Sequence, residues 1–242
     1  MLRQTISRLV PRKLKQVLRP PAPPSGFESA IRRLNLDSGV VFDVGANVGD
    51  MTFAMLEVFP KATIYAFEPC SGTHQALAER VAGSRNAGRV RLFRNGFFDQ
   101  ATVRPLNVTS FNGANSLLGI TPEYHEMNPH IEERTTEDIT LVRLDDFVRE
   151  QGIRHIDLIK IDVEGAEYEV LAGGRETLST MVDAVIVEIS FVRHPREQGE
   201  FIRVFEILHE CGFAPAEVYD VGHAETQRVW RLAQFDCVFR RY

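Results

Sequence analysis

A tight turn and an acid beyond it are the residues of this 242-residue chain with the clearest chemical meaning. The turn runs from Gly45 through Ala46 and Asn47 to Gly49, between an apolar stretch and a helical pattern. Glu68 closes a second apolar stretch, at the spacing of about 20 residues at which a carboxylate meets the ribose of a bound nucleoside in doubly wound α/β folds. The two features together predict a nucleoside-binding pocket.

Asn47 narrows the choice of nucleoside. In dinucleotide-binding turns this position is a glycine, which lets the backbone approach a pyrophosphate, and a side chain there disfavours that approach. Exposed backbone N–H groups and the Asn47 amide could instead hold a carboxylate and an ammonium, and Asp43 before the turn could take a positive charge. The pattern therefore favours S-adenosylmethionine over NAD. A nicotinamide-dependent oxidoreductase and a non-catalytic S-adenosylmethionine-binding module are the alternatives.

Further acids end two later apolar stretches. Asp162 could serve in the pocket as an orienting acid, a base or a metal ligand, or could simply cap the helix that follows it. Together with Glu188, Asp162 would suit Mg²⁺, which prefers oxygen ligands. Lys160 alternates with Asp162 and could be a buried, paired charge. His194 could deprotonate a substrate hydroxyl, because histidine titrates near working pH, or could be an ordinary surface histidine.

Hydrophobic periodicity indicates the elements that position these residues. Short apolar stretches alternate with amphipathic ones, as in parallel sheets joined by right-handed helical crossovers. The expected strands cover residues 39–44, 63–67, 89–93, 155–162 and 184–189, and the expected helices cover 29–36, 51–59, 73–82, 145–150, 164–171 and 197–210. Residues 214–219 and 228–240 should form an antiparallel hairpin at the edge. The prediction is an α/β fold, a Rossmann-like seven-stranded, mostly parallel sheet with helices on both faces.

Two segments stand apart from this rhythm. Residues 1–26 carry six basic and no acidic residues and end in a Pro-rich linker, so they could form an arm that contacts an anionic membrane surface or a loosely docked terminal helix. Residues 110–135 show no clear periodicity and are interpreted as a lid, between extra strands at 103–108 and 139–144 that should pair. The folded domain is expected to cover residues 27–242.

Composition limits the class of protein. A net charge of -5 argues against general nucleic-acid binding, which requires a basic excess. Cys70, Cys211 and Cys237 are few, odd in number and far apart, which favours free thiols in a reducing compartment. We expect no transmembrane helix and a cytoplasmic location. The oligomeric state is not predicted.

Several motifs together resemble the FkbM-type family of S-adenosylmethionine-dependent methyltransferases. The resembling stretches are Phe42–Gly49 with Thr52, Ala66–Pro69, Leu144–Phe147, Ile156–Glu167 and Val170–Gly174. The resemblance implies the class I methyltransferase fold and transfer of a methyl group to a hydroxyl. The implied acceptors are sugars, glycan or glycolipid precursors, or secondary metabolites.

The resemblance also implies roles for individual residues. The turn should hold the methionine part of the donor, Glu68 the ribose hydroxyls, and Asp99 the adenine amino group. The residues predicted to bind the donor are Asp43, Gly45, Ala46, Asn47, Gly49, Thr52, Glu68, Pro69 and Asp99. Asp162 and His194 are the candidate catalytic residues, and Asp162 and Glu188 the candidate metal ligands.

Overall fold

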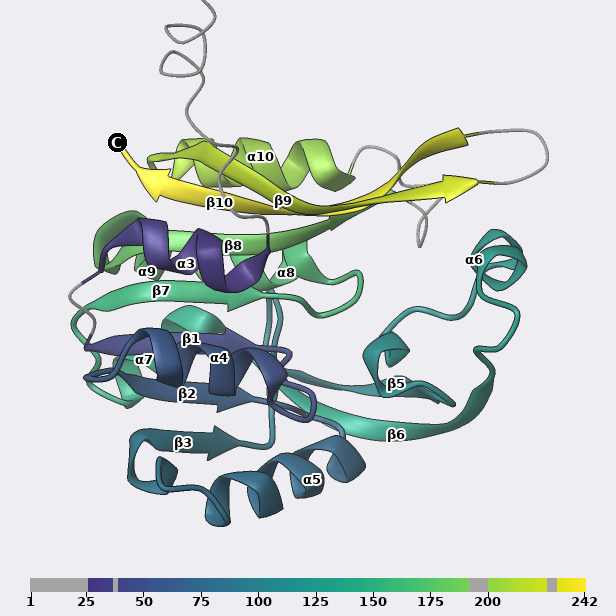
Figure 1. The fold of residues 1–242 in the computed structure, drawn as a ribbon, viewed down its shortest axis with the longest axis horizontal. Helices are drawn as coiled ribbons and strands as arrows, with labels where there is room; N and C mark the ends of the chain where they lie inside the picture. Colours follow the sequence, from purple (N-terminus) through teal and green to yellow (C-terminus); the bar gives the residue numbers. More distant parts are fainter. Residues whose placement is uncertain (1–25, 37–38, 192–199, 226–229) are drawn as a thin grey trace, which may run out of the picture.

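A seven-stranded sheet organises the protein in a computed structural model that describes residues 26–36, 39–191, 200–225 and 230–242 (Figure 1). The strand order is β3-β2-β1-β7-β8-β10-β9. The five strands from β3 to β8 are parallel, whereas β10 is antiparallel to both of its neighbours. The strands are β1 (Val40–Val44), β2 (Thr63–Phe67), β3 (Val90–Phe93), β7 (Ile156–Ile161), β8 (Val182–Ser190), β9 (Phe213–Glu225) and β10 (Trp230–Arg241). This order confirms the predicted Rossmann-like sheet with its terminal hairpin.

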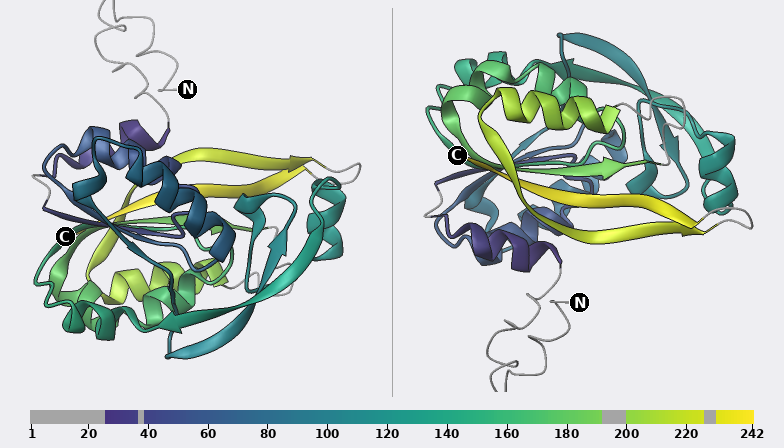
Figure 2. Two further views of the ribbon diagram at one scale, coloured as in Figure 1. Left: turned by 90° about the horizontal axis from the view of Figure 1, so that it is seen from below. Right: turned by 90° about the horizontal axis from the view of Figure 1, so that it is seen from above.

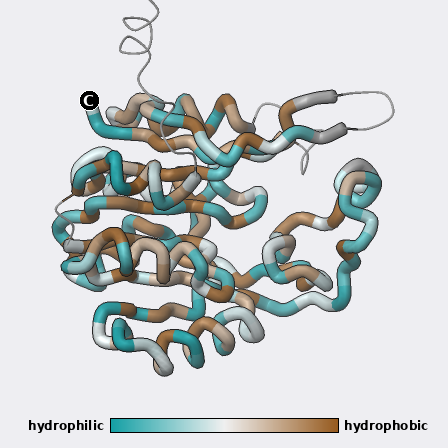
Figure 3. The backbone as a smooth tube through the Cα atoms, in the orientation of Figure 1, coloured by the Kyte–Doolittle hydropathy of each residue, from teal (hydrophilic) through white to brown (hydrophobic). Residues whose placement is uncertain are grey.

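Helices cover both faces of this sheet (Figure 2). One face carries α3 (Phe27–Leu34), α4 (Asp50–Val58) and α5 (Ser71–Ala82), and the other carries α7 (Leu144–Glu150), α8 (Glu167–Ala172), α9 (Arg175–Met181) and α10 (Glu200–Glu210). Successive residues of a strand point to opposite faces, so Val41 packs beneath α3 and α4, and Phe42 and Val44 pack on the α7–α10 side. Burial on both faces explains why most residues of the central strands are apolar (Figure 3).

The predicted extra strands form a second, three-stranded sheet in the order β4-β6-β5. Its members are β4 (Gly96–Phe97), β5 (Thr102–Thr109) and β6 (Glu133–Val142), and β5 and β6 are antiparallel as expected. β6 begins earlier than predicted because its polar first half pairs with the end of β5. Between the two strands lie the short 3-10 helix η2 (Asn112–Ala114) and α6 (Pro122–Met127), in the stretch predicted to be irregular. Its role as a lid stays a prediction.

The chain after β7 differs from the prediction. The helix expected from residue 164 begins only at Glu167, because Glu164 and Gly165 have left-handed φ angles of 59° and 108°. The N-cap position of α8 is Ala166, so the interpretation of Asp162 as its cap is wrong. The Glu167 carboxylate instead accepts hydrogen bonds from the N–H groups of Val163 and Gly165 and closes this loop.

Some expectations fall outside the described residues. They include the basic arm up to residue 25, His194, and the first residues of the helix expected from 197. Among the described residues, no helix is long and apolar enough to cross a membrane. α9 was not predicted separately, although its start follows directly from the glycines that end α8.

Candidate active site

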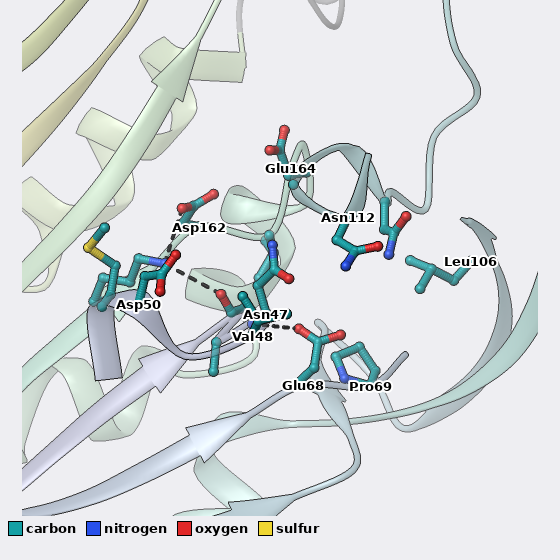
Figure 4. Close-up of a pocket in the computed structure, with 16 residues that line it drawn as sticks. Asn47, Val48, Asp50, Glu68, Pro69, Leu106, Asn112, Asp162 and Glu164 are labelled. Carbon is teal, nitrogen blue, oxygen red and sulfur yellow. Dashed lines mark hydrogen bonds and ion pairs between the residues drawn. The ribbon is translucent and has the colours of Figure 1, made fainter. Parts of the chain in front are cut away.

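A pocket of about 210 Å³ opens at the carboxyl ends of β1, β2 and β7 (Figure 4). Parallel α/β sheets place their ligands at this edge. The pocket is lined by Gly45, Ala46, Asn47, Val48, Asp50, Met51, Glu68, Pro69, Leu106, Asn112, Gly113, Asn115, Lys160, Asp162, Val163 and Glu164. The structure thus brings most of the predicted donor-binding residues together with Asp162.

The turn after β1 is shaped by its contact with the end of β7. Gly45 has a φ of 80°, and a Cβ atom built there would lie 1.8 Å from the carbonyl oxygen of Asp162. The N–H of Asp162 in turn donates to the carbonyl of Val44 at 3.1 Å. Glycine at position 45 therefore lets two strand ends touch.

Most N–H groups of this turn already have protein partners. Those of Gly45 and Ala46 donate to the Phe67 carbonyl, and that of Asn47 donates to Glu68 Oε2 at 2.8 Å. The expectation that these groups are exposed for a ligand carboxylate is therefore wrong. The first N–H groups of α4 lack intrahelical partners, and such groups can receive a carboxylate.

Glu68 is fixed at the end of β2 by several hydrogen bonds. Its Oε1 accepts from the N–H of Cys70 at 3.0 Å and from the Thr73 hydroxyl at 2.7 Å. Burial raises the pKa of this carboxyl, and these hydrogen bonds, together with that from Asn47, oppose the rise. A carboxylate held this firmly presents its remaining lone pairs in one direction, as recognition of a ribose hydroxyl requires.

Lys160 joins the turn to the end of β7. Its ammonium lies 3.1 Å from the Asp162 carboxylate, 3.7 Å from that of Asp43, and 3.4 Å from the Gly45 carbonyl oxygen. Burial would lower the pKa of Lys160, but Asp162 and Asp43 outweigh it and raise that pKa above its ordinary value. Lys160 is therefore a permanent cation in the pocket wall. The predicted buried charge pair is present.

Asp43 and Thr52 lie beneath the pocket and are not among its lining residues. Both are fully buried, and the Thr52 hydroxyl donates to the Asp43 carboxylate at 2.5 Å. The positive charge that Asp43 meets is the Lys160 ammonium. Any effect of Asp43 on a ligand is therefore exerted through Lys160 and the turn.

Three acids gather beside the pocket, with carboxylate oxygens within 4.8 Å of one another: Asp162, Glu164 and Glu188. Burial, and then the charge of Asp162, raise the pKa of Glu188 well above its ordinary value. Glu188 also accepts a hydrogen bond from Gln234 at 3.1 Å. The two predicted metal ligands thus lie close together, and Glu164 joins them.

Asp236, which the sequence reasoning missed, pairs with Glu188 in the β8–β10 register. Burial and the charge of Asp162 raise the pKa of Asp236 to about 7. The signal for this residue was a lone acid within the apolar stretch of the predicted hairpin strand. Its partner could be named only once β10 was placed next to β8.

Asp99 is exposed and does not line the pocket. The chain leaves β3 into β4, where Phe97 and Phe98 are buried, and Asp99 emerges beside Gly173. The pocket wall is completed instead by residues of the β5–η2 segment, of which Asn112, Gly113 and Asn115 lie in the stretch predicted to be a lid and Leu106 lies before it. Their amide-rich composition was the available signal.

Comparison with known proteins assigns the chain to a methyltransferase family, which agrees with the Rossmann-like strand order. A family profile described as "Methyltransferase FkbM domain" matches residues 43–215. The chain belongs to the FkbM methyltransferase family. It is 34% identical over 212 residues to the 31-O-demethyl-FK506 methyltransferase FkbM of Streptomyces tacrolimicus, covering 78% of this chain and 77% of that protein.

Other relatives of this FkbM-family chain are covered less completely. Methyltransferase sdnD of Sordaria araneosa is 33% identical over 172 residues, 61% of this chain and 65% of that protein. The 2-O-methyltransferase NoeI of Sinorhizobium fredii is 32% identical over 146 residues, 58% and 59% of the respective chains. A crystal structure of methyltransferase FkbM from Methylobacillus flagellatus is 16% identical with a TM-score of 0.48, covering 84% of this chain and 44% of that one.

S-adenosylmethionine is the cofactor that the fold and the family imply, and the pocket fits it. Glu68 can accept from ribose hydroxyls, and the first turn of α4 can receive a carboxylate. The buried Oδ1 of Asn47 has no hydrogen-bond partner among the described residues, and it is the acceptor that an amino-acid ammonium requires. When bound, the cofactor supplies an activated methyl group.

Proposed function

We propose that this enzyme transfers a methyl group from S-adenosylmethionine to a hydroxyl of a sugar, a glycan or glycolipid precursor, or a secondary metabolite. The observation that carries the proposal is the Asp162 carboxylate, which lines the pocket with its side chain 33% exposed and is paired with Lys160. A carboxylate in this position can accept the hydrogen bond of an acceptor hydroxyl. Relatives named a 31-O-demethyl-FK506 methyltransferase and a 2-O-methyltransferase support an oxygen acceptor.

Positioning is the main contribution that we assign to the protein. Holding two reactants in line accounts for much of the acceleration in such transfers. Asp162 would orient the hydroxyl and receive its proton, while Lys160 holds the carboxylate against the end of β7. His194 stays a predicted alternative base that lies outside the described residues.

Replacement of Asp162 tests the proposal. Asp162→Asn keeps the size of the side chain but removes its basicity, so turnover should fall about 10²–10⁴-fold. Affinity for S-adenosylhomocysteine, measured by calorimetry, should change only a few-fold. Methyl transfer is measured by mass spectrometry on a panel of hydroxylated acceptors. An equal loss of turnover and donor affinity would show that Asp162 acts only on the structure of the pocket.

The predicted magnesium ion can be tested in the same assay. Support for it is the proximity of Asp162, Glu164 and Glu188. If an ion held by these acids orients the acceptor, EDTA should abolish turnover, added Mg²⁺ should restore it, and Glu188→Gln should shift the Mg²⁺ titration. Full activity of the EDTA-treated enzyme would exclude the ion.

Of the two alternatives, family membership removes the nicotinamide-dependent oxidoreductase. The non-catalytic module would bind S-adenosylhomocysteine yet methylate no acceptor in the panel. Retention of Glu68, Lys160 and Asp162 in one pocket favours turnover.

A further inference from the structure

One wall of the donor pocket comes from the insert between the two sheets. Leu106 of β5 and Asn112 of η2 line the pocket together with Glu68 and Pro69 of the β2 end. In the close-up, Asn112 and Leu106 lie on the insert side and Glu68 and Pro69 on the sheet side (Figure 4). On the donor assignment made above, Glu68 accepts from the ribose hydroxyls, and the base attached to that ribose can lie against this wall.

The wall is a built structure, anchored on both sides. The N–H of Thr109 donates to Asn115 Oδ1 at 2.9 Å, and the Ala114 N–H donates to the Phe111 carbonyl at 2.8 Å. The buried Ser116 hydroxyl donates to the Glu164 carbonyl at 2.6 Å, which ties the turn to the loop after β7. The backbone of η2 is thereby fixed relative to Asp162.

The two asparagines of this wall differ in what they can offer a ligand. The Asn115 carboxamide is used within the protein, by Thr109 and by a 3.8 Å contact to the Cys70 sulfur. The Asn112 carboxamide makes no hydrogen bond within the described residues and is exposed at the pocket. It therefore offers both a donor and an acceptor to a ligand.

Adenine is complementary to the donor and acceptor of the Asn112 carboxamide. Its edge with the exocyclic amine presents an N–H donor next to a ring-nitrogen acceptor, and a carboxamide can bind both at once. Leu106 and Pro69 supply apolar surface for the faces of a base, and Leu106 is buried beneath the wall. Asp99, by contrast, is exposed and does not line the pocket.

We propose that Asn112 recognises the adenine of the donor, so that the insert, and not Asp99, supplies base specificity in this enzyme. The proposal rests on the donor assignment made above. Asn112 accepts from the N6 amino group and donates to the neighbouring ring nitrogen. The same insert then limits both which donor is held and where the acceptor can enter.

The test compares two ligands on four proteins. Calorimetry measures the affinities of S-adenosylhomocysteine and of its 6-deamino purine analogue for the wild-type chain, Asn112→Ala, Asp99→Ala and Asn128→Ala. Asn128 is the matched control, because it belongs to the same insert and its amide donates to Tyr124 of its own helix. The wild type and the control should prefer the adenine ligand by about tenfold, the value of one good hydrogen bond.

Asn112→Ala should lose this preference while retaining affinity for the deaminated analogue. Loss of both ligands to the same extent, or an unchanged preference for adenine, would overturn the assignment. Asp99→Ala should keep the preference for adenine. Loss of the preference in Asp99→Ala would show that Asp99, and not Asn112, recognises adenine. A wild-type protein that binds neither ligand would instead refute the donor assignment on which the proposal rests.

Discussion

The two walls of the donor pocket are built in opposite ways. At the strand ends, the buried Lys160 ammonium forms ion pairs with the buried Asp43 carboxylate and with the partly exposed Asp162 carboxylate. Across the pocket, η2 presents an exposed amide on a turn held by a few hydrogen bonds. A substitution in the first wall should therefore affect folding as well as binding, whereas one in the second should affect mainly binding.

The largest expected effect comes from removing the cation of the first wall. Lys160→Met would leave the fully buried Asp43 without its counter-charge, and breaking a buried pair in this way costs about 3–5 kcal/mol. The free energy of unfolding, measured by urea titration, should fall by this amount. The double variant Lys160→Met/Asp43→Asn removes both charges and should be less destabilised than the single one. Equal losses in both variants would show that the pair has no coupling energy.

A slightly smaller loss is expected from Gly45→Ala. The new Cβ would lie 1.8 Å from a backbone oxygen at a φ of 80°, and overpacking with an unfavourable φ costs about 3 kcal/mol. Gly72→Ala is the control, because it lies in α5 with nothing within 4 Å of the new atom. Thermal unfolding should show a lower Tm for the first variant and an unchanged or higher one for the second. Equal Tm values would contradict the close approach of β1 and β7.

On the strand-end side of the pocket, titration of Asp236 should make the free energy of unfolding depend on pH. Its folded pKa of about 7 lies above the ordinary value for an aspartate, so the folded state holds a proton that the unfolded chain releases. This contribution is complete below about pH 4 and is lost as the pH rises through about 7. We expect a loss of about 1 kcal/mol or more across this range, and a flatter profile in Asp236→Asn. A wild-type profile as flat as that of the variant would contradict the raised pKa.

The smallest effect is expected at the anchor of the second wall. Ser116→Ala removes the hydrogen bond to the Glu164 carbonyl and should cost about 1 kcal/mol, together with a few-fold loss of affinity for S-adenosylhomocysteine. Ser179→Ala removes an exposed hydroxyl that bonds to the Arg175 carbonyl of its own helix and should change neither quantity. If the affinity of Ser116→Ala equals that of the wild type, the wall is held by its other bonds alone.

The same contrast separates what the sequence predicts from what it does not. Strand and helix periodicity is a local property, and the order of a parallel sheet with right-handed crossovers follows from it. Glu68, Asn47 and Asp162 therefore came to one pocket as predicted. The contacts of Asn112 and Asp236 could not be predicted in this way. Those of Asn112 depend on how the polar insert between β5 and β6 folds back, and those of Asp236 depend on which edge of the sheet the terminal hairpin joins.

Local backbone conformation was the second limit. Glu164 and Gly165 adopt left-handed φ angles that delay α8, and Glu167 holds this loop with its carboxylate. A glycine after an acid is compatible with many turns, so the sequence alone favoured an earlier helix start. The consequence was an incorrect capping role for Asp162, while its position at the pocket was correct.

The pairing of β5 with β6 also bears on how acceptor preference can change during evolution. Because Thr102 pairs with Leu141 and Val108 with Thr135, the chain leaves and re-enters the domain at adjacent points. The segment beyond η2, residues 117–132, can then be lengthened, shortened or exchanged between relatives at little entropic cost and without disturbing the sheet. A chimaera with a foreign segment there should keep its donor and acquire a different range of acceptors.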